Sequence, residues 1–287
     1  MNGHQLVRDR YGKQRVHLTW LDRDRDPHVL RQLVVDIGLE GDFASSYLTG
    51  DNRTVIATDS MKNTVYVLAR ERGVASLEGF ALLLAEHFVS TYPQVERASV
   101  GADELPWRPI RVDGAAHPHA FTGGCGLDTA SALAERGRRP EVTSGLRDLQ
   151  VLKSADSGFS DFVADRFRTL ADTGDRLFAT SIAATWRRAE DCSGDDQSWP
   201  ADRAAVRDAL LAAFARHSSL SVQQTLYAMA TAALDAAPSV AEVSLVLPNQ
   251  HHLLVDLGPF GLDNPNRVFV GTREPSGCIE GTVRRGG

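Results

Sequence analysis

Apolar and polar residues alternate near the start of the chain in a pattern that predicts two paired strands. Val16, Leu18 and Trp20 are separated by polar residues, and a period of two is typical of a strand with one buried face. The charged segment 22–26 predicts a hairpin loop, and residues 29–39 predict the partner strand. The pattern therefore indicates that the chain opens with a β-hairpin.

The segment from Thr54 to Ala69 is apolar and β-branched at both ends and polar in the middle. Residues 54–57 and 64–69 each match a strand, and the residues between them include a hydroxyl, a carboxylate, an ammonium and an amide. This pattern predicts two strands joined by a polar turn. Ser, Asp and Asn favour turns because they form local hydrogen bonds. The segment is therefore either an ordinary surface turn or one side of a pocket.

Helical periodicity recurs at three places in the chain. Apolar residues repeat at intervals of three and four across residues 77–92, with Ser76 in the position of an N-cap. Two alanine-rich segments, 201–216 and 222–237, repeat the pattern. Further strands are predicted at 95–100, 107–112, 149–153, 178–186, 240–247 and 252–257.

The second half of the sequence repeats features of the first. Residues after the first long helix recur 145 positions later, as the pairs Pro93 and Pro238, Val95 and Val240, Ala98 and Val243, Ser99 and Ser244, and Val100 and Leu245. This repeat predicts a duplicated α+β unit, in domains 1–140 and 141–287, with antiparallel strands and helices on one face. The Gly- and Ala-rich residues 122–145 predict a boundary or mobile connection. Because such sheets leave edge strands open, we expect a symmetric oligomer.

Composition and charge restrict the function. The 287 residues carry a net charge of −6, whereas nucleic-acid binding needs a concentrated basic face. No apolar run approaches the roughly 18 residues that span a bilayer, and the polar N-terminus does not resemble an export signal. Cys125, Cys192 and Cys278 form no CxxC pair, so neither a disulfide framework nor a thiolate metal site is indicated. We expect a cytoplasmic protein without nucleic-acid or membrane partners.

Several short motifs, each weak alone, occur in one order along the chain. They are Tyr11-Gly12-Lys13, Thr58-Asp59, His117-Pro118-His119, Val151-Leu152-Lys153-Ser154, Phe159 with Arg176, Ser221-Val222-Gln223 and Leu247-Pro248-Asn249-Gln250-His251-His252. From about Tyr11 to Glu280 the chain resembles urate oxidase (uricase), the cofactor-free enzyme of purine breakdown. The resemblance implies an α+β fold with a tandem pair of tunnelling-fold (T-fold) domains. It also implies a homotetramer that forms a β-barrel tunnel, with active sites at subunit interfaces.

The same resemblance implies roles for individual residues. Lys13, Thr58 and Asp59 of one chain would complete a site in its neighbour, and Lys13, Thr58 and His251 would be catalytic. The urate-binding residues would be Thr58, Asp59, Phe159, Leu170, Arg176, Val222, Gln223 and Asn249. The implied reaction converts urate, O₂ and water into 5-hydroxyisourate and hydrogen peroxide, with no cofactor and no metal.

These residue types suit that chemistry. The planar guanidinium of Arg176 and the amide of Gln223 can grip opposite ends of a flat purine trione, and Phe159 can cover its ring face. Lys13, hydrogen-bonded to Thr58, can take a proton and pass it towards oxygen if its proton affinity is low enough.

Each residue also has an ordinary explanation. Lys13 alone is a surface lysine and Arg176 a solvated turn cation, because such side chains are mostly exposed. Phe159 alone is a core ring, and Gln223 and Asn249 suit capping or turn roles. The joint match of all of them to one family's pattern favours the enzyme.

Two other functions stay open at this point. The first is a T-fold hydrolase acting on a pterin or purine, with His117, His119 and Cys125 holding a metal. The second is a purine-binding protein without catalysis, which would bind urate but consume no oxygen. Metal content and oxygen consumption separate the three possibilities.

Overall fold

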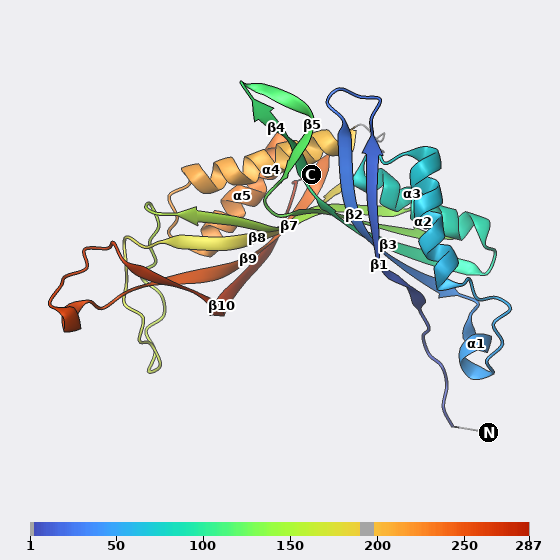
Figure 1. The fold of residues 1–287 in the computed structure, drawn as a ribbon. Coiled ribbons are helices and arrows are strands. Elements are labelled where there is room, and N and C mark those ends of the chain that lie inside the picture. The colour runs from blue at the N-terminus through green and yellow to red at the C-terminus, as the bar shows by residue number, and fades with distance from the viewer. Residues whose placement is uncertain (1–2, 190–197, 287) are drawn as a thin grey trace. The chain divides into compact units, whose positions relative to one another are not determined.

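The computed structural model of the protein describes residues 3–189 and 198–286, so Cys192 lies outside the described residues. The chain forms two compact units, which divide inside strand β7 (Glu141–Lys153), between Gly145 and Leu146. The domain boundary expected after residue 140 falls at the start of the same strand. Each unit has its own strands and helices (Figure 1).

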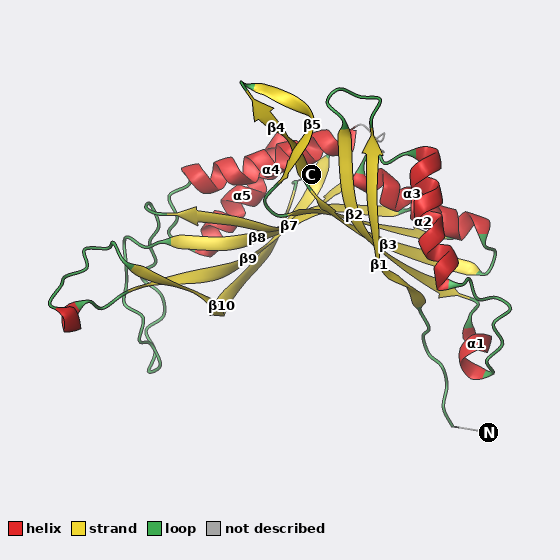
Figure 2. Ribbon diagram, viewed as in Figure 1, coloured by secondary structure: helices red, strands yellow, loops and turns green. Residues whose placement is uncertain are grey.

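The first unit is an antiparallel sheet with helices on one face (Figure 2). Its strands follow the order β1-β2-β3-β6, namely β1 (Tyr11–Asp22), β2 (Val29–Gly41), β3 (Val95–Leu105) and β6 (Leu127–Glu135). The helix α2 (Thr58–Arg72) packs against β1, and α3 (Leu77–Thr91) packs against β3 and β6. A short helix, α1 (Ala44–Leu48), and the hairpin of β4 (Trp107–Val112) and β5 (Ala115–Gly123) complete this unit.

Local sequence explains why these elements form. Leu33, Val35 and Ile37 alternate along β2 and are buried against the helices, which follows the period of two. Ser76 caps α3 as predicted, because its Oγ accepts a hydrogen bond from the backbone N–H of Gly79 at 2.9 Å. The predicted opening hairpin and the helix over 77–92 are therefore confirmed.

The second unit has a similar architecture. Its strands follow the order β7-β8-β9-β10, with β8 (Phe178–Arg188), β9 (Val240–Leu254) and β10 (Phe269–Arg284). Its helices are α4 (Ser198–Arg216) and α5 (Val222–Ala236), with a 3₁₀ turn at Gly258–Phe260. The part of α4 from Ala201 onwards belongs to this unit. The helix α5 packs against β9 and β10. A second core, including Phe178, Leu210 and Met229, fills the space between sheet and helices.

The repeat at an offset of 145 residues corresponds to structure. In both units two strands precede the helices and further strands follow them. The second unit has the two helices that the sequence predicted, whereas the first has α1 and α2 in addition to the predicted α3. The strands β3 and β9 begin at Val95 and Val240, the predicted equivalent positions. Ser76 and Ser221, also 145 apart, cap α3 and α5 in the same way. Within the described residues, no helix is long and apolar enough to cross a membrane.

The prediction of two strands in residues 54–69 is wrong. Residues 54–57 belong to a loop, and α2 begins at Thr58. Met61, Val65 and Leu68 are buried at helical spacing on the face towards the core. The β-branched Thr64, Val65 and Val67 favour a strand locally, but tertiary packing outweighs that preference.

Two further predictions need correction near the C-terminus. Strand β9 runs unbroken through Pro248, Asn249 and Gln250, where the sequence predicted a break between two strands. Pro248 is paired with Cys278 on β10, while no pair with β8 is recorded at this position, so its missing N–H is tolerated. Strand β10 was not predicted. None of its side chains is fully buried, and its alternation of partly buried and exposed residues is confined to residues 279–284.

Residues 122–145 were expected to hold a boundary or a mobile connection; they form strands rather than a loose connection, and the division between the units falls at their end, after Gly145. They contain β6 and the beginning of β7. Ala130, Ala132 and Ala134 alternate along β6 and are buried beneath α3. Small residues gave the segment weak patterning in sequence, yet they allow the helix to pack closely on the sheet.

Candidate active site

Lys13 and the start of α2 form the first group of predicted site residues. Lys13 lies on β1 opposite Ile37, directly before a register shift between Lys13 and Val16. Irregularities of this kind bend a strand and redirect its side chains. Thr58 and Asp59 are the first residues of α2, which packs against β1. The term "α2 cluster" denotes Lys13, Thr58 and Asp59.

Within the α2 cluster, the charge of Lys13 acts on the Asp59 carboxyl. A hydrogen bond from Lys62, together with smaller effects that include the charge of Lys13, holds the pKa of the Asp59 carboxyl below its usual range. Lys62 Nζ lies 2.6 Å from Asp59 Oδ1, and Asn63 Nδ2 donates to Oδ2 at 3.0 Å. Both carboxylate oxygens are therefore bound by their own helix.

The N-terminus of α2 offers backbone donors. Its N-cap, Ala57, provides no side-chain acceptor, so the N–H groups of the first turn are available for a ligand. The helix dipole adds partial positive charge at this end. The α2 cluster can therefore combine an ammonium, a hydroxyl and N–H donors at one place.

Arg176 and Phe159 form the centre of a second group. The Arg176 Cζ atom lies 5.3 Å from the centroid of the Phe159 ring and 5.9 Å from that of Phe178. Burial lowers the pKa of the Arg176 guanidinium. Its Nη2 atom is buried and has no hydrogen-bond partner within the described residues. A buried guanidinium nitrogen without a partner is costly, and an anionic ligand would satisfy it.

Hydrogen bonds between three segments hold Arg176 and Phe159 in place. Arg176 N–H donates to the carbonyl of Ser157 at 2.9 Å, and Phe159 exchanges two backbone hydrogen bonds with Thr173 at 2.7 and 3.0 Å. Gly158 N–H donates to the carbonyl of Ser219 at 2.8 Å. The loop before α5 is therefore joined to the segment that carries Phe159.

The start of α5 separates two neighbouring glutamines. Ser221 Oγ accepts from the N–H of Gln224, and Gln224 Oε1 accepts from the N–H of Leu220 at 3.1 Å. Gln224 therefore completes the cap. The Gln223 side chain is exposed and makes no hydrogen bond within the described residues. The "Arg176 cluster" denotes Phe159, Arg176, Val222 and Gln223.

Asn249 and His251 lie two residues apart on β9. Asn249 is opposite Thr180 on β8 and Gly277 on β10, and His251 is opposite Thr272. The register of β10 shifts between Thr272 and Gly277. Side chains two residues apart point to the same face of a strand. These two residues therefore share one face of the second unit's sheet.

Leu170 is the predicted site residue that the structure connects least to the others. Its side chain is 59% exposed, and its carbonyl accepts a hydrogen bond from Arg168 Nε at 3.0 Å. The Arg168 guanidinium lies over Phe162 at 4.0 Å, and Phe162 stacks on Phe159 with centroids 4.6 Å apart. Among the described residues, Arg168 and Phe162 thus link Leu170 to Phe159.

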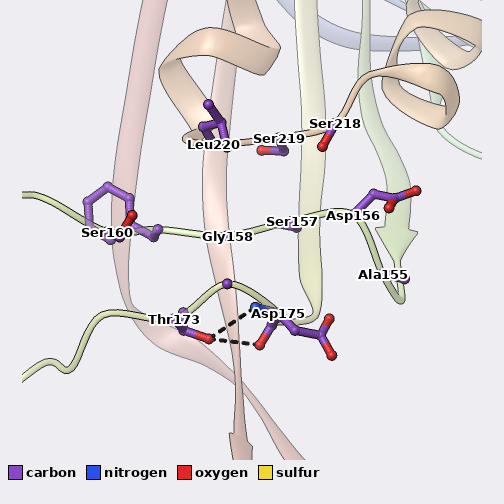
Figure 3. Close-up of a pocket in the computed structure, with 12 residues that line it drawn as sticks. Ala155, Asp156, Ser157, Gly158, Ser160, Thr173, Asp175, Ser218, Ser219 and Leu220 are labelled. Atoms are coloured by element: carbon purple, nitrogen blue, oxygen red, sulfur yellow. Dashed lines mark hydrogen bonds between the residues drawn. The ribbon is translucent and has the colours of Figure 1, made fainter.

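A cavity of about 450 Å³ lies beside the Arg176 cluster. It is lined by residues 155–160, 173–175 and 218–220, and Figure 3 shows these segments side by side, with Thr173 Oγ1 bonded to the backbone of Asp175. Phe159 belongs to the lining, whereas Arg176 and Gln223 do not.

His117 and His119 lie together on β5, with ring centroids 4.5 Å apart. His28 lies 6.2 Å from His119, and Cys125 is exposed. Within residues 3–189 and 198–286, no three His, Cys, Asp or Glu side chains gather in a way that could hold a metal ion. The metal site that the rival hydrolase needs is therefore not assembled there.

Comparison with known proteins identifies the family. The uricase family profile matches residues 9–124 and 142–280. The chain is 38% identical to the uricase of Danio rerio, covering 98% of this chain and 95% of that protein. The crystal structure of the Arthrobacter globiformis uricase is 39% identical, with a TM-score of 0.91 over 100% of this chain and 96% of that one. The chain belongs to the uricase family.

The uricase match contains all ten predicted site residues, since each lies within residues 9–124 or 142–280. The structural likeness confirms the predicted α+β class and the tandem T-fold domains. The uricase of Bacillus fastidious is more distant, at 25% identity and a TM-score of 0.83 over 96% of this chain and 93% of that one.

Sequence reasoning missed the residues that support the two clusters. Ser157, Ser219 and Thr225 are almost fully buried, and Ser219 Oγ accepts from Thr225 Oγ1 at 2.8 Å. Lys62 and Asn63 bind the carboxylate of Asp59. Only the helical spacing of Asp59, Lys62 and Asn63 gave a signal for these contacts in sequence, and the strand prediction concealed it.

Proposed function

We propose that the protein is a urate oxidase, which converts urate, O₂ and water into 5-hydroxyisourate and hydrogen peroxide in purine catabolism. The main support for this proposal is the match to the uricase family over nearly the whole chain. The geometry of the two clusters supports it. Neither a metal-dependent hydrolase nor a binding protein without catalysis is favoured by an observation of its own.

The Arg176 cluster is proposed to bind the urate anion. Arg176 would place its unpartnered Nη2 against a carbonyl oxygen, and the amide of Gln223 would bind the opposite end of the ring. Phe159 would cover the ring face, with Leu170 near the ring edge. The backbone N–H of Val222, at the positive end of α5, would bind another edge acceptor.

The α2 cluster and β9 are proposed to carry out the chemistry. Urate must act as its own electron donor, because the proposed reaction uses no cofactor. Lys13 and Thr58 would take a proton from the substrate and pass it towards oxygen, with His251 completing the relay. The backbone N–H of Asp59 would bind urate. Asn249, with Thr58, would hold oxygen, peroxide or the attacking water above the ring.

The complete site is proposed to combine two chains of a homotetramer. The α2 cluster supplies proton-transfer groups but no guanidinium, while the Arg176 cluster supplies the anion-binding groups. The outermost strands of the two units, β1 and β10, are available for pairing with other copies in a closed barrel. A cytoplasmic location stays a prediction.

An oxygen electrode tests the proposal directly. With urate and a metal chelator present, the protein should consume one O₂ and produce one hydrogen peroxide per urate, as the reaction stoichiometry requires, while the ultraviolet band of urate fades. Binding of urate without oxygen consumption would indicate the binding protein. Fading of the urate band without oxygen consumption, abolished by the chelator and restored by zinc, would indicate the hydrolase.

A further inference from the structure

The Tyr11 hydroxyl connects the two parts of the α2 cluster. It donates to the carbonyl of Ile56 at 3.2 Å and accepts from the N–H of Ile56 at 2.8 Å. Tyr11 lies two residues before Lys13 on β1, and Ile56 lies two residues before Thr58. We propose that Tyr11 is a positioning residue that fixes Thr58 relative to Lys13. This inference rests on the proposed urate oxidase function.

The chain geometry makes this link short. Tyr11 and Lys13 share one face of the strand, because side chains two positions apart point the same way. Lys13 follows Tyr11 by two residues, and Thr58 follows Ile56 by two residues. Two residues of extended chain span at most about 7 Å. A shift of the Tyr11 hydroxyl would therefore move the start of α2 relative to Lys13.

Tyr11 is itself held rigidly. Its ring contacts the fully buried Phe43 edge-on, with centroids 4.7 Å apart. The adjacent Gly12 lies so close to β2 that an added Cβ would meet the carbonyl oxygen of Ile37 at 1.8 Å. Ile56 is only 6% exposed. Both ends of the link are therefore anchored in the core of the first unit.

The chemistry of the phenol fits a permanent link. Burial raises the pKa of Tyr11, so the hydroxyl keeps its proton across the neutral range and can always donate to Ile56. Another side chain also binds the loop before α2, since Gln94 Nε2 donates to the carbonyl of Thr54 at 2.8 Å. That contact is four residues from Thr58, whereas the link from Tyr11 is two residues away.

The substitution Tyr11→Phe removes both hydrogen bonds and keeps the ring. We expect kcat to fall about 10- to 100-fold, because small misplacements of catalytic groups have effects of this size. The KM for urate and the affinity for urate without oxygen should change less than about threefold, because the Arg176 cluster is intact. If Tyr11 had a merely structural role, Tyr11→Phe would lower the thermal midpoint of unfolding but would not lower kcat more than it changes KM.

Two matched controls accompany this variant. Tyr66→Phe alters an exposed tyrosine on α2, and Gln94→Ala removes the more distant hydrogen bond to the same loop. Both should keep kcat within about twofold of the wild type. Should Tyr11→Phe fail to fold, Phe43→Leu keeps the hydroxyl but loosens the ring that directs it, and the same fall in kcat is expected.

The outcomes are distinct. If the wild-type protein oxidises urate and the folded Tyr11→Phe variant keeps the wild-type kcat, Tyr11 is not a positioning residue although the function stands. If Tyr11→Phe does not fold and Phe43→Leu is used in its place, a wild-type kcat of folded Phe43→Leu also overturns the positioning role. If the wild-type protein consumes no oxygen with urate, the proposed function fails and the role of Tyr11 falls with it.

Discussion

At the scale of single residues, polar groups without partners mark the candidate site. Arg176 Nη2 is buried without a hydrogen bond within the described residues, and the exposed Gln223 amide makes none within the same ranges. Other polar groups of the chain, such as the carboxylate of Asp59, are satisfied by neighbours. Other buried polar atoms, such as Thr180 Oγ1 and His217 Nε2, also lack a hydrogen-bond partner within the described residues. A guanidinium and an amide, however, are groups with which a planar anion can form paired hydrogen bonds.

Substitutions in the two clusters should affect different kinetic parameters. We expect Arg176→Lys or Arg176→Ala to raise the KM for urate by about 10- to 100-fold, because a hydrogen bond to a charged group is worth roughly 1.5–3 kcal/mol. Lys13→Met or Thr58→Ala should instead lower kcat more than it weakens binding. Steady-state kinetics measure both. Equal effects of both kinds of variant on KM and kcat would contradict this division of roles.

The Asp59–Lys62 ion pair predicts a pH dependence of stability. The hydrogen bond from Lys62 lowers the pKa of Asp59 in the folded protein. A carboxyl group whose pKa is lower in the folded than in the unfolded protein stabilises the fold above its pKa in the unfolded protein, which is about 4. This contribution is lost as the pH falls through the pKa of the folded protein. Lys62→Met should therefore lower the thermal midpoint slightly at pH 7 but not at the acid end.

Added salt should reduce the effect of Lys62→Met, because the Asp59–Lys62 pair is exposed and is screened by ions. Thermal unfolding of both proteins at several pH values and salt concentrations measures this. A stability difference that grows towards low pH would contradict the assignment.

At the scale of elements, helix starts carry the candidate site. The helices α2 and α5 present their N-terminal turns to the two clusters, and the two differ in capping. The cap of α5 uses Ser221 and Gln224, whereas α2 has no side-chain cap. Capping in α5 therefore leaves Gln223 available for a ligand.

The two adjacent glutamines of α5 should give opposite results. Gln224→Ala removes a capping contact and should lower the free energy of unfolding by about 0.5–2 kcal/mol, with KM near the wild-type value. Gln223→Ala should raise KM and change stability by less than about 0.5 kcal/mol. Chemical denaturation and steady-state kinetics of the two variants provide the comparison. A larger KM effect from Gln224→Ala would mean that the two roles are reversed.

Particular elements show how far the sequence predicts the fold. Helix α3 and the hairpin of β1 and β2 were predicted because their patterns are regular and Ser76 signals a cap. Helix α2 was missed because Thr64, Val65 and Val67 favour strands locally while the buried face is set by tertiary packing. Strand β10 was missed because none of its side chains is fully buried and its alternation is confined to residues 279–284.

The candidate site was predicted less directly than the fold. The residues were named from a resemblance, and the structure brings Lys13 near Asp59 and Arg176 near Phe159. Sequence reasoning could not find Tyr11, Ser157 or Ser219 as supports, because their hydrogen bonds join segments far apart in the chain. The roles of all ten site residues stay predictions.

At the scale of the whole molecule, each chain carries two clusters that lie in different units. The proposed reaction needs proton-transfer groups and anion-binding groups at one substrate. A homotetramer in which each site combines the α2 cluster of one chain with the Arg176 cluster of another would supply both. This arrangement is the central claim of the account.

Mixing two impaired variants tests that claim most directly. Lys13→Met impairs the α2 cluster and Arg176→Ala the Arg176 cluster, and both should be nearly inactive at urate concentrations well below the KM of Arg176→Ala. Co-expressed in equal amounts, they should form hybrid oligomers in which about one quarter of the sites contain both intact clusters, if a site draws one cluster from each of two chains. Oxygen consumption with urate, compared with either variant alone, measures this. The account predicts recovery of up to about a quarter of wild-type activity for random assembly, whereas no recovery in verified hybrids would contradict it.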